Sequence, residues 1–286
     1  MRLITQPDEG IAPLLAAVKR ARRRLVIVIF RFDLDELEDA LEAAVKRGVE
    51  VLALIAHTNK GGEQRLRKLE QRMLKKGVTV NRTNDDMVRY HGKLLIIDRS
   101  AAYILGFNFT ADDLQSRSFG VVSKSSRVIK ELQRLFDSDA NRTDYTPRVR
   151  DLVVSPENAR SRLYRFIRRA RVSLDIYDPN VADDEMLSLL ERKAARGVRI
   201  RIIGSLEKKW EKAGFAAVQP LRGRLHVRAI VRDGRRAFIG SQSLRKLELD
   251  ERREVGIIIR ERKVVRKVEK VFNDDWKQAT RKKNSD

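Results

Sequence analysis

Short apolar runs alternate along the chain with segments in which apolar and polar residues repeat every three or four positions. Residues 25–30, 49–56 and 94–97 are runs of aliphatic and β-branched side chains, which predicts buried strands. Residues 11–24 and 33–46 have the spacing of amphipathic helices. Strands that alternate with helices predict an α/β fold with parallel or mixed sheets.

The second part of the chain repeats this order. The predicted elements are a helix at 158–170, a strand at 172–177, a helix at 183–196 and a strand at 198–203. Gly48 and Gly197 end corresponding helices and lie 149 residues apart. A polar stretch at 138–156 separates the two copies. We therefore predict two similar α/β halves, residues 1–147 and 148–286, related by a pseudo-two-fold axis.

One polar pattern occurs in both copies around an apolar strand. Its residues are His91, Lys93 and Asp98 in the first copy, and His226, Arg228 and Asp233 in the second. The two histidines are 135 residues apart, and the chain has three histidines in all. Alternate residues of a strand point to one face, so histidine and cation are expected to leave the backbone together. Near a pseudo-two-fold axis, His91 and His226 can share one site.

Two imidazoles facing one phosphodiester can divide the chemistry between them. One attacks phosphorus and becomes phosphohistidine, while the other protonates the leaving oxygen and later activates water or an alcohol. Lys93 and Arg228 are placed to stabilise charge on the phosphoryl oxygens. This chemistry needs neither a metal nor another cofactor, and none is predicted.

The pattern His-x-Lys-(x)4-Asp, followed by a turn of small residues, resembles the motif of the phospholipase D superfamily. The resemblance covers both halves and implies a duplicated phospholipase D-like fold with a metal-independent phosphodiesterase or phosphatidyltransferase site between them. In the first copy Asn108 follows the motif, and in the second Ser241 and Ser243 do. These three residues are predicted to bind substrate, whereas Asp98 and Asp233 are predicted to have a structural, orienting role.

The second motif departs from the family pattern at two positions. Arg228 replaces lysine, and Ser243 stands where the first copy has Asn108. Arginine keeps the charge but presents a larger, planar group. The alternative to an enzyme is therefore a catalytically impaired module that binds phosphate or nucleic acid.

A carboxylate that orients a histidine is expected after the second motif. Glu254 lies 28 residues beyond His226, where similar proteins carry such a group, and the first copy has Ser118 in the corresponding place. A carboxylate beside one ring nitrogen favours the protonated imidazole. On this basis Glu254 is predicted to act on His226, with His226 as general acid and His91 as nucleophile.

Charge and composition restrict the partners. The 286 residues hold 62 lysines and arginines against 40 acids, a formal charge of +22, which favours a polyanionic substrate. Nucleic acid fits, and so does anionic phospholipid in a cardiolipin-synthase-like reaction with peripheral membrane contact. The apolar runs are too short to span a bilayer, and the chain start lacks the apolar core of a signal peptide. The expectation is a cytoplasmic location, with peripheral attachment to the membrane left open.

Overall fold

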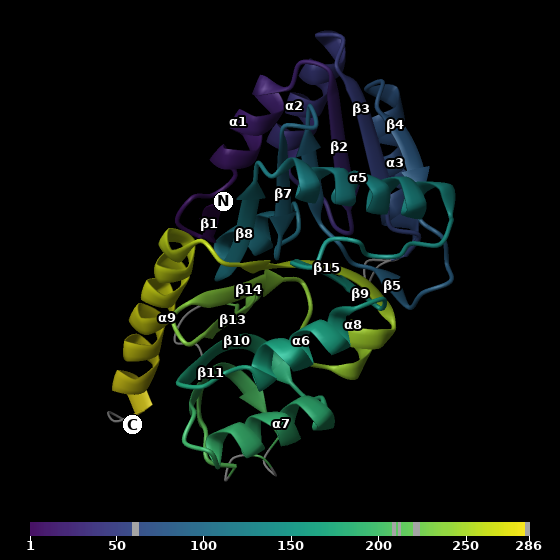
Figure 1. The fold of residues 1–286 in the computed structure, drawn as a ribbon. Coiled ribbons are helices and arrows are strands. Elements are labelled where there is room, and N and C mark those ends of the chain that lie inside the picture. The colour runs from purple at the N-terminus through teal and green to yellow at the C-terminus, as the bar shows by residue number, and fades with distance from the viewer. Residues whose placement is uncertain (59–62, 208–209, 211–212, 220–223, 284–286) are drawn as a thin grey trace.

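The computed structural model describes residues 1–58, 63–207, 210, 213–219 and 224–283, which form two β-sheets and their covering helices (Figure 1). The strands of the first sheet are β1 (Arg2–Gln6), β2 (Arg24–Ile29), β3 (Glu50–Ile55), β4 (Thr79–Arg82), β6 (Leu94–Ile97), β7 (Ala101–Leu105) and β8 (Ser118–Ser123). Those of the second are β5 (Arg89–Tyr90), β9 (Leu152–Ser155), β10 (Ser173–Val181), β11 (Arg199–Leu206), β12 (Ala216–Val218), β13 (Arg228–Arg232), β14 (Arg236–Gly240) and β15 (Arg252–Ile259). The helices are α1 (Ala12–Arg20), α2 (Asp35–Lys46), α3 (Glu63–Lys75), α4 (Ala111–Gln115), α5 (Ser126–Asn141), α6 (Ala159–Arg168), α7 (Asp184–Ala194), α8 (Lys246–Asp250) and α9 (Arg262–Lys283).

Both sheets have the same strand order. The first runs β1-β8-β7-β6-β2-β3-β4, and the second repeats it as β9-β15-β14-β13-β10-β11-β12. In each of these orders the last three strands are parallel to one another and the remaining pairs are antiparallel, so both sheets are mixed. The prediction of a duplicated α/β fold with two mixed-sheet halves is confirmed.

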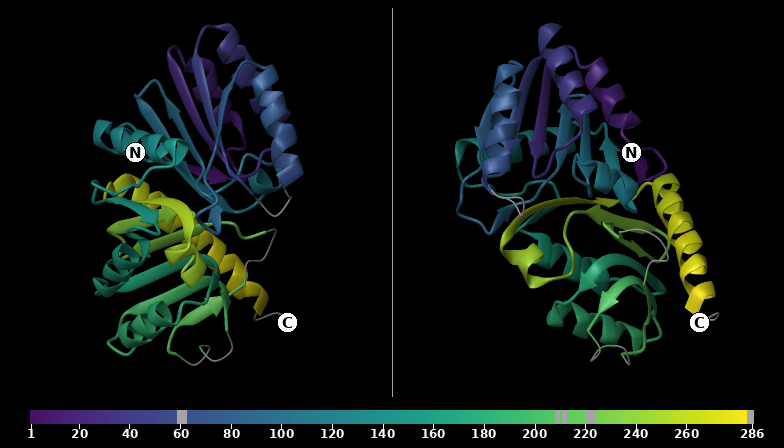
Figure 2. Two further views of the ribbon diagram at one scale, coloured as in Figure 1. Left: turned by 90° about the vertical axis from the view of Figure 1, so that its right-hand side faces the viewer. Right: turned by 180° about the vertical axis from the view of Figure 1, so that it is seen from behind.

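The two sheets face each other across a shared apolar core. Strand residues of the first sheet, such as Val28 and Leu94, belong to one buried cluster with Ala229 and Ile239 of the second. Separate clusters fill the outer faces, beneath α1, α2 and α3 on the first sheet and beneath α6 and α7 on the second. Figure 2 shows the long helix α9 along the side of the second half. Apolar runs without alternation are thus explained, because both faces of the central strands are buried.

The helices begin and end at residues whose chemistry suits those places. Asp183 accepts a hydrogen bond from the Met186 backbone N–H at 3.1 Å and caps α7. Gly48 and Gly197, which follow α2 and α7, both have φ of 80°, a conformation that glycine adopts without steric cost. The equivalent helices therefore turn into β3 and β11 in the same way.

Strand β5 belongs to the second sheet although it precedes β6 in the first. It pairs in parallel with β15 through Arg89–Arg252 and Tyr90–Arg253. The chain thus leaves the second sheet at Tyr90 and enters the first at Leu94. The division between residues 147 and 148 stays a prediction. Strand β5 precedes this division in the chain but belongs to the second sheet.

None of the described helices is long and apolar enough to cross a membrane, and α9, at 22 residues, is rich in charge.

Candidate active site

The His91-Gly92-Lys93 segment lies between β5 and β6 rather than in a strand, which corrects the prediction that strand alternation orients it. Tertiary pairing explains the difference, because the His91 backbone N–H donates to the Arg253 carbonyl of the second half at 2.7 Å. The two side chains nevertheless meet, with Lys93 Nζ 2.8 Å from His91 Nε2. Both are buried.

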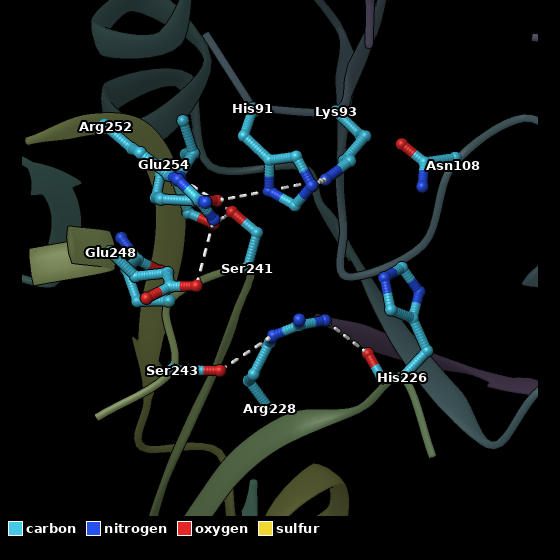
Figure 3. Close-up of polar contacts among 12 residues, drawn as sticks. His91, Lys93, Asn108, His226, Arg228, Ser241, Ser243, Glu248, Arg252 and Glu254 are labelled. Carbon is cyan, nitrogen blue, oxygen red and sulfur yellow. Dashed lines mark hydrogen bonds and ion pairs between the residues drawn. The ribbon is translucent and has the colours of Figure 1, made fainter. Parts of the chain in front are cut away.

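His226 is held by the equivalent arrangement in the other half of the pseudo-two-fold pair. Its backbone N–H donates to the carbonyl of Arg117 in the first half at 3.0 Å, and Arg117 forms a parallel bridge with Leu225. Each histidine is therefore anchored to the backbone of the opposite half. The pseudo-two-fold axis runs between these two anchors, and it brings the histidines to one place. Figure 3 shows His91, Lys93, His226 and Arg228 around the same space.

Glu254 contacts His91 and not His226, which corrects the predicted pairing. Its Oε2 lies 2.8 Å from His91 Nδ1, and the carboxylate is fully buried. The crossed anchoring is the cause, since Glu254 follows Arg253, the residue that binds the His91 backbone. A carboxylate can only accept at Nδ1, so we assign the tautomer in which Nδ1 carries the proton and Nε2 presents its lone pair.

Asp113 is the carboxylate beside His226, and sequence reasoning missed it. Its Oδ2 lies 3.2 Å from His226 Nδ1, at ion-pair distance although not aligned for a hydrogen bond. The Asn108 backbone N–H and Nδ2 both donate to Oδ2 at 2.6 Å, and Arg224 Nη1 donates to Oδ1 at 3.1 Å. A signal existed, because Asp113 and Glu248 are 135 residues apart and occupy the equivalent helices α4 and α8.

The position equivalent to Glu254 in the first half is occupied by Ser118. Its side chain is fully buried, and among the described residues its Oγ has no hydrogen-bond partner. The two histidines therefore have different acidic neighbours: Glu254 follows the anchor residue of His91, whereas Asp113 reaches His226 from α4. This asymmetry gives the two rings different surroundings within a symmetric frame.

Burial and clustered cations determine the charge of the site. Burial, with Lys93 and Arg228 nearby, lowers the pKa of His91 well below its ordinary value. Burial also lowers the pKa of His226 to about 4, although Asp113 opposes the shift. The pKa of Lys93 falls to about 7, mainly through burial, while Glu254 partly restores it. Burial raises the pKa of Glu254, against the effects of Lys93 and a hydrogen bond from Ser241. Both imidazoles are thus neutral without substrate.

Arg228 is oriented by residues of its own motif. Its Nη1 donates to the His226 carbonyl at 2.8 Å, and its Nε donates to Ser243 Oγ at 3.3 Å (Figure 3). These contacts use two of the five N–H donors of a guanidinium. Arg228 and Ser243 are therefore hydrogen-bonded to each other at the positions where the first half has Lys93 and Asn108.

The remaining predicted residues lie around this centre. Ser241 exchanges hydrogen bonds with the backbone of Val255, next to Glu254: its N–H donates to the carbonyl at 3.1 Å, and its Oγ accepts from the N–H at 3.1 Å. Asn108 is buried and holds Asp113. Asn108, Ser241 and Ser243 thus support the charged residues through contacts within the protein, and their binding of substrate stays a prediction.

Asp98 and Asp233 lie at the far ends of β6 and β13. The Asp98 carboxylate accepts hydrogen bonds from the backbone N–H groups of Arg22, Arg23 and Arg24 at 2.8 to 3.0 Å. Asp233 Oδ1 accepts from residues 171, 172 and 173 at 2.7 to 3.1 Å. Both aspartates tie the hairpin of their half to the start of the neighbouring strand, as a structural role requires.

Comparison with known proteins identifies the family. The profile described as cardiolipin synthase, PLD-like domain, matches residues 14–140 and 163–276, one segment in each half. The chain belongs to the phospholipase D superfamily. Cardiolipin synthase 1 of Bacillus anthracis is 22% identical over 98% of the chain and 67% of its own length, and its Bacillus cereus counterpart gives the same values.

Two solved structures share the phospholipase D-like fold across both halves. The polyphosphate kinase of Porphyromonas gingivalis has a TM-score of 0.76 at 18% identity, covering 95% of this chain and 49% of that one. The phosphatidylserine synthase of Haemophilus influenzae has a TM-score of 0.74 at 11% identity, covering 97% and 86%. At such identities the likeness concerns the fold, and the chain spans only about half of the kinase.

Proposed function

We propose that this phospholipase D superfamily protein breaks a phosphodiester through a phosphohistidine on His91, and that an anionic phospholipid is the substrate. One observation carries the proposal: Glu254 of the second half lies 2.8 Å from Nδ1 of His91, and Nε2, on the other side of the ring, faces Lys93 (Figure 3). The match to a cardiolipin synthase profile supports lipid over nucleic acid, and the charge of +22 suits an anionic surface.

In the first step the lone pair of His91 Nε2 attacks phosphorus, and the bond to the leaving oxygen breaks. Lys93 Nζ lies 2.8 Å from Nε2 and 2.9 Å from Nδ1 of His91, so the substrate must draw that ammonium onto a phosphoryl oxygen. Arg228 adds donors from the other side of the site. Because phosphoryl charge spreads over several oxygens, fixed cations on two sides stabilise the transition state.

His226 serves as the acid and then as the base. A bound phosphodiester anion, together with Asp113, raises its pKa and favours the imidazolium. The ring gives a proton to the leaving oxygen, then removes one from water or an alcohol that attacks phosphorus. The nitrogen–phosphorus bond breaks, and His91 returns to its starting state. Water yields hydrolysis, and the hydroxyl of a second lipid yields phosphatidyl transfer.

Trapping the intermediate tests the proposal. Wild type, His91→Asn and His226→Asn are incubated with phosphatidylglycerol in mixed micelles, with bis(p-nitrophenyl) phosphate and with single-stranded DNA, all with chelator. After rapid quenching, intact-mass and peptide analysis locates any adduct. We expect an adduct on His91 and none in His91→Asn.

Each other outcome has a definite meaning. An adduct on His226 reverses the roles of the two rings. Turnover of DNA but not lipid overturns the proposed substrate. Equal absence of adduct and product in wild type and His91→Asn contradicts catalysis and favours a phosphate-binding module, as the unusual Arg228–Ser243 pair would then suggest.

A further inference from the structure

A second basic site lies in the second half, at the opposite end of β13 from the catalytic residues. Arg228 begins this strand at the active site and Arg232 ends it. Four residue steps of extended chain separate them, which corresponds to roughly 13 Å. At that end is a cavity of about 150 Å³. One water molecule needs only about 10–15 Å³, so the cavity has room for a larger group.

The cavity walls carry seven arginines and one carboxylate among the described residues. Arg162, Arg165 and Arg169 come from α6 and the residue after it, and Arg232 and Arg236 come from the β13–β14 hairpin. We call the cavity lined by the seven arginines the arginine pocket. Figure 1 shows α6 packed across the sheet that carries the hairpin.

Carboxylates near the pocket leave most of the arginine charge uncompensated. Arg150 and Arg260 are the remaining two of the seven arginines, and the one lining carboxylate, Asp151, binds Arg260 Nη2 at 2.6 Å. Asp233, next to the pocket, is occupied by three backbone N–H groups and is 3.9 Å from Arg232 Nε. The nearby carboxylates therefore offset only a small part of the seven charges.

Arg232 and Arg236 are directly opposite each other in the antiparallel ladder. Like charges at such positions destabilise a sheet. Arg232 is also fixed, because its guanidinium lies 4.6 Å from the ring centroid of the buried Phe166 and its Nη1 donates to the Phe166 carbonyl at 3.0 Å. Burial, with Arg236, Arg169 and Arg260 near, lowers the pKa of Arg232. An oriented, crowded guanidinium cluster is costly unless an anion occupies it.

The first half shows that the fold does not require these arginines. Leu174 pairs with Arg232 as Leu25 pairs with Ile97, and Arg232 pairs with Arg236 as Ile97 pairs with Ala101. The hairpin arginines thus replace an isoleucine and an alanine. By the offset of 149 residues, Arg162 and Arg165 correspond in the same way to Pro13 and Ala16. The arginine pocket is a feature added to the second copy.

We propose that the arginine pocket binds a single phosphate group, separate from the catalytic site. Guanidinium groups hold phosphate through paired donors, which suits a converging cluster. A nucleic-acid backbone would require cations spaced along a track, whereas these arginines converge on one cavity. The phosphate belongs either to a lipid headgroup or to a free phosphate compound. This proposal is independent of the catalytic one, since its readout is binding.

The test removes the hairpin pair by copying the first half, as Arg232→Ile/Arg236→Ala. Calorimetric titration with inorganic phosphate and with pyrophosphate at low ionic strength counts binding sites. We expect the double variant to bind one equivalent fewer than wild type. The control Arg127→Ala/Lys130→Ala removes two exposed charges from α5 and should keep the full number. Unchanged stoichiometry and affinity in the double variant would overturn the pocket.

Stability and source are checked with the same proteins. Thermal unfolding of the double variant should show little change, because removal of the opposed charges offsets the lost contacts of Arg232 with Phe166. Arg165→Ala, at an exposed residue, provides a second variant, in which phosphate binding is expected to weaken at least several-fold. Co-sedimentation with phosphatidylglycerol and phosphatidylcholine vesicles identifies the source. Weaker binding of the variants to the anionic vesicles alone indicates a headgroup, and unchanged vesicle binding indicates a free phosphate compound. Binding of single-stranded DNA is measured with the same variants. Weakened DNA binding in a variant whose phosphate titration is unchanged would contradict a single-phosphate pocket.

Discussion

His91 Nδ1 lies 2.8 Å from Glu254 Oε2, although 163 residues separate them along the chain. The contact exists because each half anchors the histidine of the other through a backbone hydrogen bond. It fixes the tautomer and orientation of one ring within a site that is otherwise two-fold in design.

We expect Glu254→Gln to lower kcat by about 10²–10⁴-fold, because an amide no longer favours the tautomer with a free Nε2. The matched control is Ser118→Ala at the symmetric position, whose hydroxyl has no partner among the described residues and which should retain activity. Steady-state hydrolysis of bis(p-nitrophenyl) phosphate measures both. Equal losses in the two variants would show that Glu254 does not have this special role.

Asp113→Asn should impair the acid step selectively. With the charge beside His226 removed, the imidazolium is harder to form, and the penalty grows as the leaving oxygen becomes more basic. We therefore expect a small loss with a p-nitrophenyl leaving group and a loss of about tenfold or more with an alkyl one. The comparison of the two substrates in each protein is the measurement. A uniform loss would indicate that Asp113 is only structural.

Much of the fold was predictable from local patterns, and part of the site was not. The strands at residues 25–30 and 94–97 and the helix at 33–46 follow from short-range periodicity, and the 135-residue offset brought His91 and His226 together. The partner of Glu254 could not be predicted, because it depends on β5 of one half joining the sheet of the other. Spacing along the chain indicated His226 as the partner of Glu254. In the structure, however, each histidine binds the backbone of the opposite half.

Arg228 and Ser243 should act as a coupled pair. In Arg228→Lys the bonds to the His226 carbonyl and to Ser243 Oγ are lost, and a charged group's hydrogen bond contributes about 1.5–3 kcal/mol. We expect about a tenfold or greater loss of kcat/KM. Arg228→Lys/Ser243→Asn, which reproduces the Lys93–Asn108 pair of the first half, should recover part of it. Additive effects in this double-mutant cycle would mean that the two residues act separately.

Asp98→Ala should reduce stability without changing the chemistry. Burial alone would raise the pKa of Asp98, but hydrogen bonds from the backbone N–H groups of Arg24, Arg23 and Arg22 outweigh it, and the pKa is lowered. The carboxylate therefore stabilises the fold at neutral pH, and this contribution is lost as pH falls below the ordinary value of 3.8. We expect a loss of about 1.5–3 kcal/mol at pH 7 in urea unfolding. A large drop in kcat with unchanged stability would contradict the structural role.

Acid should destabilise the protein through His226 before it protonates most carboxylates. The pKa of His226 falls from 6.5 to about 4, mainly through burial, so between these values the unfolded chain binds more protons than the folded one. Unfolding free energy therefore decreases as pH falls from 6.5 towards 4, by a total on the order of 3 kcal/mol from this group. In His226→Asn that contribution is absent, and the difference between the two curves isolates it from the carboxylates. Urea unfolding at half-unit steps of pH provides both curves. Parallel curves would mean that the ring becomes protonated inside the folded protein as easily as outside it, and the neutral imidazole assigned to the free site would then be wrong.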